Sequence, residues 1–360
     1  RDVRGRAPVA AFIFPNSFRS ALVPYLAKVP RRVGVRGNLR TWMLTSPREQ
    51  PPGYEARHQA EEYFHILGLD LPDGFPMSAL QLPEATDAPP TLPARTELGV
   101  EGIQSFVVPT DDFYRIDTAL VVPQVQRDSW RLKISGLVDN DLELTYDDLL
   151  DMPQVERYIT LSCVSNEVGG DLVGNALWQG VLLKPILERA GLRDGAEQVV
   201  SRSVDGWTCG TPTDVIMDGR DAMLAIAMNG EPLPARHGYP VRMVVPGLYG
   251  YVSATKWVTD IRLTRWEDFD AYWVPRGWSK EGPVKTMARI DTPRSGRRVD
   301  GRVPIGGVAW AVHRGISRVQ VRVDEGEWLE AELGTAPSTD TWVQWVHYWD
   351  AEPGTHTVQV

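Results

Sequence analysis

Cys163 is the residue in this sequence whose surroundings most strongly suggest chemistry. The preceding residues 157–161 are β-branched and aromatic, which is typical of a strand, and the following Ser-Asn and Gly-Gly pairs indicate a loop. A thiol at a strand end, facing a polar loop, can reach a bound ion or cofactor, whereas a structural cysteine more often lies within a strand. Taken alone, the motif favours an inert thiol, and the residues downstream reverse that preference.

A second block of reactive side chains covers residues 233–257. His237 lies in a bend beside glycine, Arg242 enters a predicted buried strand over residues 241–245, and Lys256 follows two glycines and two hydroxyl residues. A buried guanidinium needs an anionic partner, so these donors suit a bound anion such as a phosphate. The alternative is that Arg242 pairs with an internal Asp or Glu and Lys256 extends its charge to solvent. The block alone does not decide between them.

A third block, residues 112–118, combines aromatic and charged side chains, among them Tyr114, Arg115 and Asp117. It could form a further wall of a cofactor site, or an ordinary surface ion pair.

The charge distribution narrows the possible partners. The net charge is −9, but residues 1–58 hold eleven Lys/Arg and three acids, so this segment carries +8 and the remainder −17. An acidic body argues against nucleic-acid binding. For the basic N-terminal segment, a solvated irregular extension is favoured over a membrane-proximal arm. No apolar run reaches the length of about 18 residues needed for a membrane span. Two cysteines exclude a disulfide scaffold and leave either one bridge or two free thiols.

The pattern of the chain predicts three parts. Residues 1–101 form an N-terminal extension, with a helix over 54–69 and a Pro-rich connector. Residues 102–283 mix strand and helix signals without a nucleotide-binding glycine fingerprint, which indicates an α+β domain. There we expect a strand over residues 130–136, a helix capped by Thr145, and a helix over residues 184–190 that ends at Gly191.

Residues 284–360 change to short alternating segments separated by glycine turns, which predicts an immunoglobulin-like β-sandwich, incomplete at its C-terminus. The strands are expected at 308–312, 317–323, 328–333, 341–349 and from 355 onward. Five tryptophans here are expected to fill the core and an interface: Trp310, Trp328, Trp342, Trp345 and Trp349. Because the chain starts without Met and stops inside a strand, we expect it to be a fragment.

The three blocks, in their order along the chain, resemble the sulfite oxidase family of molybdopterin-dependent oxidoreductases. Phe-Tyr-Arg at 113–115 is similar to the family's first pterin-contacting segment, and Ser-Cys-Val-Ser-Asn at 162–166 resembles its cysteine loop. Residues 228–257, with His-Gly-Tyr-Pro-Val-Arg, Pro-Gly and Lys-Trp, resemble its longest signature. The C-terminal strands resemble its immunoglobulin-like dimerisation domain. The resemblance covers about residues 102–360.

The resemblance implies a molybdenum–molybdopterin cofactor (Moco) and oxygen-atom transfer between Mo(VI) and Mo(IV). Cys163 would bind the metal, and Cys163 and Arg115 would be the catalytic residues. The pterin and its phosphate would be held by Tyr114, Arg115, His237, Arg242, Ser253, Thr255 and Lys256. A cytochrome or quinone-linked protein would accept the electrons, and the C-terminal domain would form a homodimer. Bacterial relatives suggest an extracytoplasmic or membrane-attached location, through N-terminal sequence lost from this chain.

The sequence also departs from the sulfite-oxidising pattern at three positions. Val168 stands where those members have an arginine, Trp278 where they have a tyrosine, and Asp117 where they have a histidine. Losing two polar contacts and gaining a carboxylate disfavours a small dianion, so an S-oxide or another organic oxide competes with sulfite as the expected substrate. Cys209 is interpreted as structural.

Two functions of other classes remain as alternatives. A cysteine hydrolase would use Cys163 as nucleophile and His237 as base, but nothing nearby in the sequence would orient the histidine. A non-catalytic β-sandwich surface protein would have lost its cofactor, and bound metal would distinguish it from the enzyme.

Overall fold

The protein is described by a computed structural model, in which residues 10–13, 28–35, 43–48 and 82–360 are described. The chain divides into two compact units, Arg1–Leu80 and Gln81–Val360. In the first unit, β1 (Ala10–Ile13), β2 (Arg31–Val35) and β3 (Ser46–Arg48) form a parallel sheet in that order. The helix expected over residues 54–69 lies outside the described residues.

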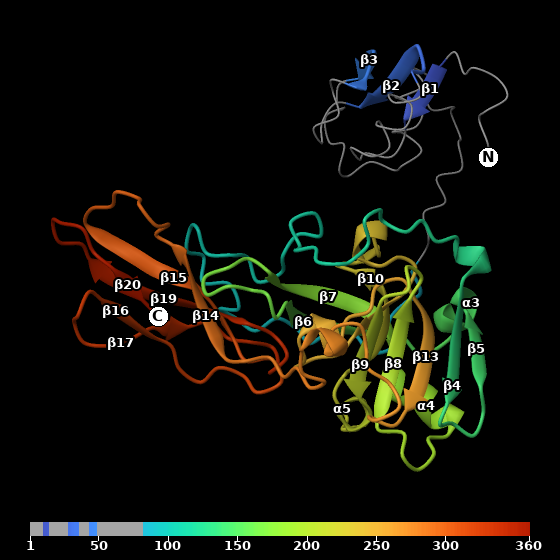
Figure 1. Ribbon diagram of the computed structural model, residues 1–360. Helices are drawn as coiled ribbons and strands as arrows, with labels where there is room; N and C mark the ends of the chain where they lie inside the picture. Colours follow the sequence, from blue (N-terminus) through green and yellow to red (C-terminus); the bar gives the residue numbers. More distant parts are fainter. Residues whose placement is uncertain (1–9, 14–27, 36–42, 49–81) are drawn as a thin grey trace. The chain divides into compact units, whose positions relative to one another are not determined.

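The second unit contains two central sheets (Figure 1). One has the order β11-β10-β7-β6, with β12 also paired to β10, and the other has the order β5-β4-β13-β8-β9. The first comprises β6 (Val155–Ser162), β7 (Val173–Leu182), β10 (Met223–Met228), β11 (Glu231–Pro232) and β12 (Arg242–Val244). The second comprises β4 (Arg131–Gly136), β5 (Leu142–Thr145), β8 (Gln198–Ser203), β9 (Thr208–Pro212) and β13 (Val258–Thr264).

Short helices connect these strands, so the α+β prediction holds with sheet predominating. They are η3 (Arg127–Ser129), α3 (Tyr146–Leu150), α4 (Leu183–Ala190), α5 (Thr213–Met217), η4 (Ala235–His237), η5 (Gly250–Val252) and η6 (Val274–Arg276). Thr145 caps α3 as expected, because its hydroxyl accepts from the Asp148 N–H while the Asp148 carboxylate accepts from the Thr145 N–H. Gly191, at φ 74°, ends α4.

Strand β6 carries the chain to the cysteine loop. It pairs antiparallel with β7 from Val155 to Ser162, and its last four residues are buried. Trp178 of β7 is fully buried and donates its indole N–H to the Ile159 carbonyl at 3.1 Å. A buried tryptophan of this kind contributes about 3–5 kcal/mol when compared with alanine. The end of β6 is therefore rigidly placed, and Cys163 is the next residue.

The C-terminal region forms two further sheets, ordered β14-β15-β19-β18 and β17-β16-β20. The larger contains β14 (Met287–Thr292), β15 (Arg302–Trp310), β18 (Glu332–Leu333) and β19 (Val343–Asp350), and the smaller contains β16 (Gln320–Val323), β17 (Leu329–Glu330) and β20 (Val358–Gln359). Strands thus lie in every segment where the sequence predicted one.

The tryptophans of this region follow the prediction with one exception. Trp310, Trp342 and Trp345 are fully buried, and Trp349 packs against the core cluster that contains Trp345. Trp328 is 44% exposed, and Arg322 lies over its ring. It therefore lies outside the core, and a place in an interface stays a prediction for it.

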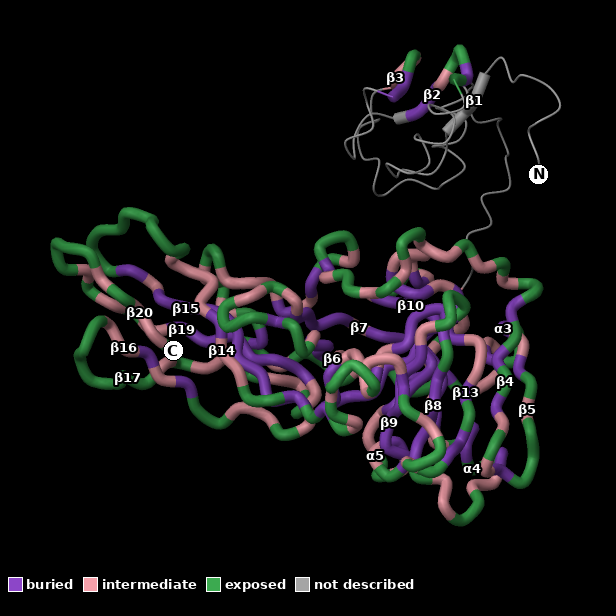
Figure 2. The backbone as a smooth tube through the Cα atoms, in the orientation of Figure 1, coloured by how far each residue is buried: buried purple, intermediate pink, exposed green. Residues whose placement is uncertain are grey.

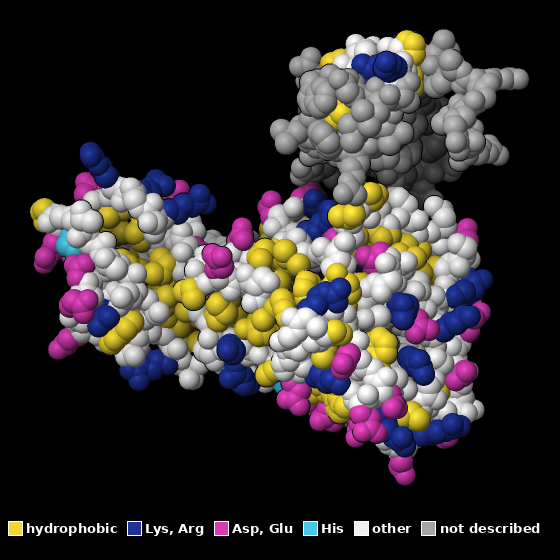
Figure 3. All heavy atoms as spheres, viewed as in Figure 1, with side chains coloured by type: hydrophobic (Ala, Val, Ile, Leu, Met, Phe, Trp, Pro, Cys, Tyr) yellow, Lys and Arg dark blue, Asp and Glu magenta, His cyan; other side chains and the backbone are white. Residues whose placement is uncertain are grey.

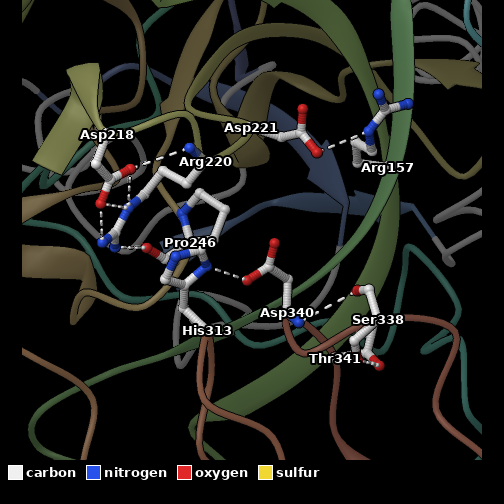
Figure 4. Close-up of polar contacts among 9 residues, drawn as sticks. All are labelled: Arg157, Asp218, Arg220, Asp221, Pro246, His313, Ser338, Asp340 and Thr341. Atoms are coloured by element: carbon white, nitrogen blue, oxygen red, sulfur yellow. Dashed lines mark hydrogen bonds and ion pairs between the residues drawn. The ribbon is translucent and has the colours of Figure 1, made fainter.

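A continuous buried core joins the C-terminal sheets to β6 and β7 (Figure 2). Trp342 donates its backbone N–H to the hydroxyl of Thr160 at 2.8 Å. Thr160 lies three residues before Cys163. A polar network lies at the same junction (Figure 4): His313 and Asp340 are paired, and Arg220 binds Asp218 and the Pro246 carbonyl. The C-terminal region therefore helps to hold the strand that leads to the cysteine.

The surface of the second unit mixes charges of both signs, and hydrophobic side chains gather on the visible face where β6, β7 and β14 lie (Figure 3). Among the helices that the structure describes, none is long and apolar enough to cross a membrane.

Candidate functional site

A cavity of about 270 Å³ opens where β6 ends. Its walls come from five segments that are far apart in the sequence, which include all three blocks singled out above. The lining includes Phe113, Tyr114, Ile116, Asp117, Cys163, Val164, Ser203, Asp205, Trp207, His237, Arg242, Tyr251, Lys256, Trp257, Trp273 and Trp278.

Cys163 is half-buried and lines this cavity from the strand end, as the sequence predicted. Its N–H donates to the Leu172 carbonyl at 2.9 Å, and its Sγ accepts from the Ser165 N–H at 3.4 Å. Asn166 closes the loop by accepting the Leu172 N–H at 2.8 Å. A Cβ on Gly170 would come within 2.7 Å of the Asn166 side-chain oxygen, so this turn needs its glycine. The thiol is thus presented to the cavity by a fixed loop.

Cys209 lies in a different environment. It is fully buried in β9, its Sγ is 3.8 Å from the Thr211 hydroxyl, and burial raises the pKa of its thiol to about 11. Both cysteines are free, which excludes the single bridge considered from the sequence. A buried thiol with a raised pKa is unreactive, in agreement with a structural role.

Arg242 enters the cavity from β12 and is only 5% exposed. Its Nη1 donates to the His237 carbonyl at 3.1 Å, and its guanidinium lies 4.8 Å from the centre of the Trp178 ring. Its Nε has no hydrogen-bond partner, and no acid among the described residues forms an ion pair with it. Burial lowers the pKa of this arginine to about 10. The alternative of an internal acidic partner is therefore wrong for Arg242.

Lys256 does have such a partner. Its Nζ lies 2.6 Å from Asp117, and both side chains are 9% exposed. Asp117 also accepts from Arg115 at 2.7 Å. Burial lowers the pKa of Lys256 to about 8, against the opposing effect of Asp117. Burial would raise the pKa of Asp117, but the hydrogen bond from Arg115 and the charge of Lys256 lower it below its usual value. This lysine reaches a carboxylate inside the cavity instead of extending to solvent.

His237 is 1% exposed and is held in its neutral form. Its Nε2 lies 3.1 Å from the Thr110 carbonyl, which fixes that nitrogen as the N–H donor, and its ring packs edge-on against Phe113. Burial first, and then the charge of Arg242, lower its pKa to about 3. Gly238 has a φ of 114°, which favours glycine. A Cβ at this position would also lie only 3.0–3.1 Å from side-chain atoms of Arg242 and Lys256, so the close approach of these two residues needs the glycine.

The remaining predicted site residues divide into two groups. Tyr114 lines the cavity, and burial raises its pKa. Arg115 is absent from the lining and faces Asp117, with 38% of its side chain exposed. The Ser253 hydroxyl donates to the Leu248 and Tyr249 carbonyls, and the Thr255 hydroxyl lies 2.6 Å from that of Ser201. Both hydroxyls are fully buried, outside the lining, and hold the chain that leads to Lys256.

The cavity has an aromatic wall formed by Trp207, Tyr251, Trp273 and Trp278. The resemblance had pointed to Trp278 as a substrate-contact position, but sequence reasoning missed the other three residues. Trp273 and Trp278 are stacked with ring centres 4.6 Å apart, and Tyr251 meets Trp278 edge-on at 4.9 Å. The cluster of aromatic residues at 272–278 was the available signal, but nothing in its spacing points to a cavity. Val168, by contrast, is 93% exposed and does not line the cavity.

The cavity suits an anion and a metal that arrives with ligands of its own. In the described part of the chain, no three His, Cys, Asp or Glu side chains converge to hold a metal ion. Cys163 is the one thiol in the lining of this cavity. The unpartnered Nε of buried Arg242 and the ammonium of Lys256 can both donate to phosphate oxygens.

Sequence comparison places the chain among molybdopterin proteins. Residues 119–273 match a family model described as the oxidoreductase molybdopterin binding domain. The uncharacterized oxidoreductase YuiH of Bacillus subtilis is 36% identical over 153 residues, which cover 42% of this chain and 74% of YuiH. The mitochondrial sulfite oxidase of Rattus norvegicus is 31% identical over 274 residues, which cover 64% of this chain. The chain spans 50% of the length of that relative.

Structural comparison agrees on the fold. The sulfane dehydrogenase SoxCD from Paracoccus pantotrophus matches with a TM-score of 0.60 and 24% sequence identity, and the match covers 69% of this chain and 70% of that chain.

Proposed function

This chain belongs to the sulfite oxidase family of molybdopterin-dependent oxidoreductases, and from that premise we propose that the Cys163 cavity binds Moco and catalyses oxygen-atom transfer. One observation carries the proposal: Arg242 is buried with no acidic partner in the described part of the chain, and it faces the same cavity as a thiol at a strand end. A buried charge without a partner is costly, and an incoming anion removes that cost.

The residues present fit the cofactor. A thiolate is a soft ligand suited to a transition metal, which assigns Cys163 to molybdenum. Arg242 and Lys256 would hold the anionic part, with the planar guanidinium able to bind a phosphate through two donors. When bound, the cofactor supplies a molybdenum centre that cycles between Mo(VI) and Mo(IV). Protein side chains then position it and exclude water.

The other side chains have supporting roles in this proposal. His237 stays neutral, so it adds no positive charge to the cavity. Its own backbone carbonyl accepts the hydrogen bond from Arg242. Tyr114 contributes a buried wall. Arg115 acts through Asp117, to which it donates, and Asp117 in turn orients Lys256. Ser253 and Thr255 support the chain that carries Lys256, since their hydroxyls are occupied.

The substrate is a small sulfur compound, with sulfite and S-oxides as the two candidates. A separate electron carrier, such as a cytochrome or a quinone-linked protein, completes the cycle. Residues 102–283 form the cofactor domain, and the matched segment 119–273 lies within it. Residues 284–360 form an immunoglobulin-like dimerisation domain, supported by its two facing sheets and buried tryptophans. The N-terminal extension, expected over residues 1–101, would attach the protein to a membrane, and residues 81–101 of it belong to the second compact unit.

Metal analysis tests the function directly. The full chain, made in a host competent for Moco synthesis, is expected to carry near-stoichiometric molybdenum together with pterin released by acid. Cys163→Ser should give an inactive protein with an altered visible spectrum, while Cys209→Ser should keep the metal and the spectrum. Folded protein free of both molybdenum and pterin would overturn the proposal.

A further inference from the structure

Apart from the part that carries Arg242 and Lys256, the cavity has a wall of aromatic side chains. Trp207 comes from the turn between β8 and β9, Tyr251 from η5, and Trp273 and Trp278 flank η6. Tyr251 is also fixed at its far end, because its hydroxyl donates to the Ser279 carbonyl at 3.1 Å. Stacked and edge-on contacts make three of these rings one rigid surface. Such a surface favours a flat or apolar group over a hydrated ion.

The charges of the lining point in the same direction. Its cations are Arg242 and Lys256, and His237 is neutral. Both cations are assigned to the anionic part of the cofactor. The carboxylates in the lining are Asp205 and Asp117, and Asp117 is paired with Arg115 and Lys256. No cation of the lining is then left for a second anion, whereas an uncharged molecule needs none.

The rim of the cavity is apolar as well. Ile116 and Val164 line it and are 51% and 37% exposed. Among the described residues, these two are the exposed large hydrophobic side chains that line the cavity itself. An apolar rim of this kind suits an apolar substituent on a ligand.

From these three observations we infer that the site takes an uncharged organic S-oxide with an apolar, preferably aromatic, substituent, and that it discriminates against sulfite. The inference rests on the proposed function and names its substrate class. The substituent would pack on Trp273 and Trp278, and larger groups would extend onto the Ile116 and Val164 rim. The sulfinyl oxygen would face the Cys163 side of the cavity.

The reaction balances as R–S(=O)–R′ + 2 H⁺ + 2 e⁻ → R–S–R′ + H₂O. The S=O bond breaks, sulfur is reduced, and the oxygen leaves as water. The two electrons come from two molecules of a reduced one-electron carrier, for which a reduced viologen dye serves in the assay. Trp278 is a specificity-determining residue here and takes no part in bond breaking.

The experiment uses one preparation of holoenzyme whose molybdenum content is known. Methyl phenyl sulfoxide and dimethyl sulfoxide are assayed with reduced viologen, and sulfite is assayed with an oxidised dye that accepts the two electrons released when sulfite becomes sulfate. Methyl phenyl sulfoxide is expected to have the highest kcat/KM. Binding of its product, methyl phenyl sulfide, is measured without turnover by calorimetry. Trp278→Leu should weaken that binding and lower kcat/KM for methyl phenyl sulfoxide about ten-fold, chiefly through KM. Its effect on dimethyl sulfoxide should be much smaller.

Two further variants keep the test decisive. Trp278→Phe retains a ring and should keep most of the affinity, which guards against misfolding of the leucine variant. Trp328→Leu removes an exposed tryptophan of the C-terminal region and should leave kcat/KM unchanged for both sulfoxides. Holoenzyme that prefers sulfite, or a Trp278→Leu variant with an unchanged ratio between the two sulfoxides, overturns the substrate inference alone. Folded wild-type protein without molybdenum overturns the proposed function and this inference with it.

Discussion

Two buried arginines show how differently the cavity and the C-terminal region handle charge. Arg289 of β14 is 8% exposed, and its Nε lies 2.6 Å from Asp291. Its Nη1 also donates to the Gly170 carbonyl at 3.0 Å, so it supports the loop that follows Cys163. Arg242 is 5% exposed and forms no ion pair with an acid among the described residues. The described part of the fold thus balances one guanidinium internally and not the other.

This difference in pairing indicates different roles for the two arginines. A charge that is paired inside the protein stabilises a fixed arrangement, and removing its partner is expensive. A buried charge without a partner destabilises the cofactor-free protein. Under the proposed function, the bound cofactor supplies the anion that offsets this cost. Three substitutions can break or sharpen this contrast.

The largest effect is expected from Arg289→Leu. It leaves the Asp291 carboxylate buried, with the Gln104 N–H at 3.0 Å as its remaining donor. Cofactor-free protein should lose about 3–5 kcal/mol in the free energy of unfolding, measured by urea denaturation. A double variant that also replaces Asp291 with leucine should recover much of the loss. If the single variant is as stable as the double, the pair does not balance a buried charge.

Arg242→Met should behave in the opposite way. No carboxylate is stranded, so cofactor-free protein should lose at least about 2 kcal/mol less than with Arg289→Leu. The affinity for the cofactor should fall about 10–100-fold, because a group that orients a bound metal cofactor is lost. Molybdenum per chain after dialysis measures this. A variant that keeps its metal but unfolds readily would show that Arg242 is structural.

The sequence was sufficient for the residues that share one continuous signature. His237, Arg242 and Lys256 were predicted to converge from the 233–257 block, and they line one cavity with Cys163. Strand ends and glycine turns are local features, so both the end of β6 and the loop after it could be inferred. The α+β class and the C-terminal strands follow from the same local patterns.

What the sequence did not determine depends on contacts between distant segments. Ser253 and Thr255 were grouped with the cofactor residues because hydroxyls suit a phosphate, but carbonyls and another hydroxyl nearby in space occupy them. Arg115 and Asp117 are two residues apart, and alternation along an extended chain could have suggested their pairing. The meeting of Trp207 with Trp278 in one wall has no such signal, since only the tertiary fold brings the two segments together.

The smallest effect concerns the histidine beside Arg242, whose charge helps to keep it neutral. His237 has a pKa of about 3 in the folded protein, below its ordinary value of 6.5, so the unfolded chain takes up the proton first as pH falls. Its contribution to stability is therefore complete above about pH 6.5 and is lost progressively toward pH 3. Between pH 7 and pH 5, wild-type protein should lose about 2 kcal/mol more in the free energy of unfolding than His237→Gln.

The control has the opposite sign. A hydrogen bond to Asp324 raises the pKa of His356, so its contribution is present at low pH and is lost as pH rises, and His356→Gln should lose more stability than wild type on acidification. Arg242→Met should itself reduce the acid sensitivity, because the charge of Arg242 opposes protonation of His237. Equal pH profiles for wild type and His237→Gln would mean that the imidazole is solvated, and that the floor of the cavity is not the dry, positively charged site that a phosphate would enter.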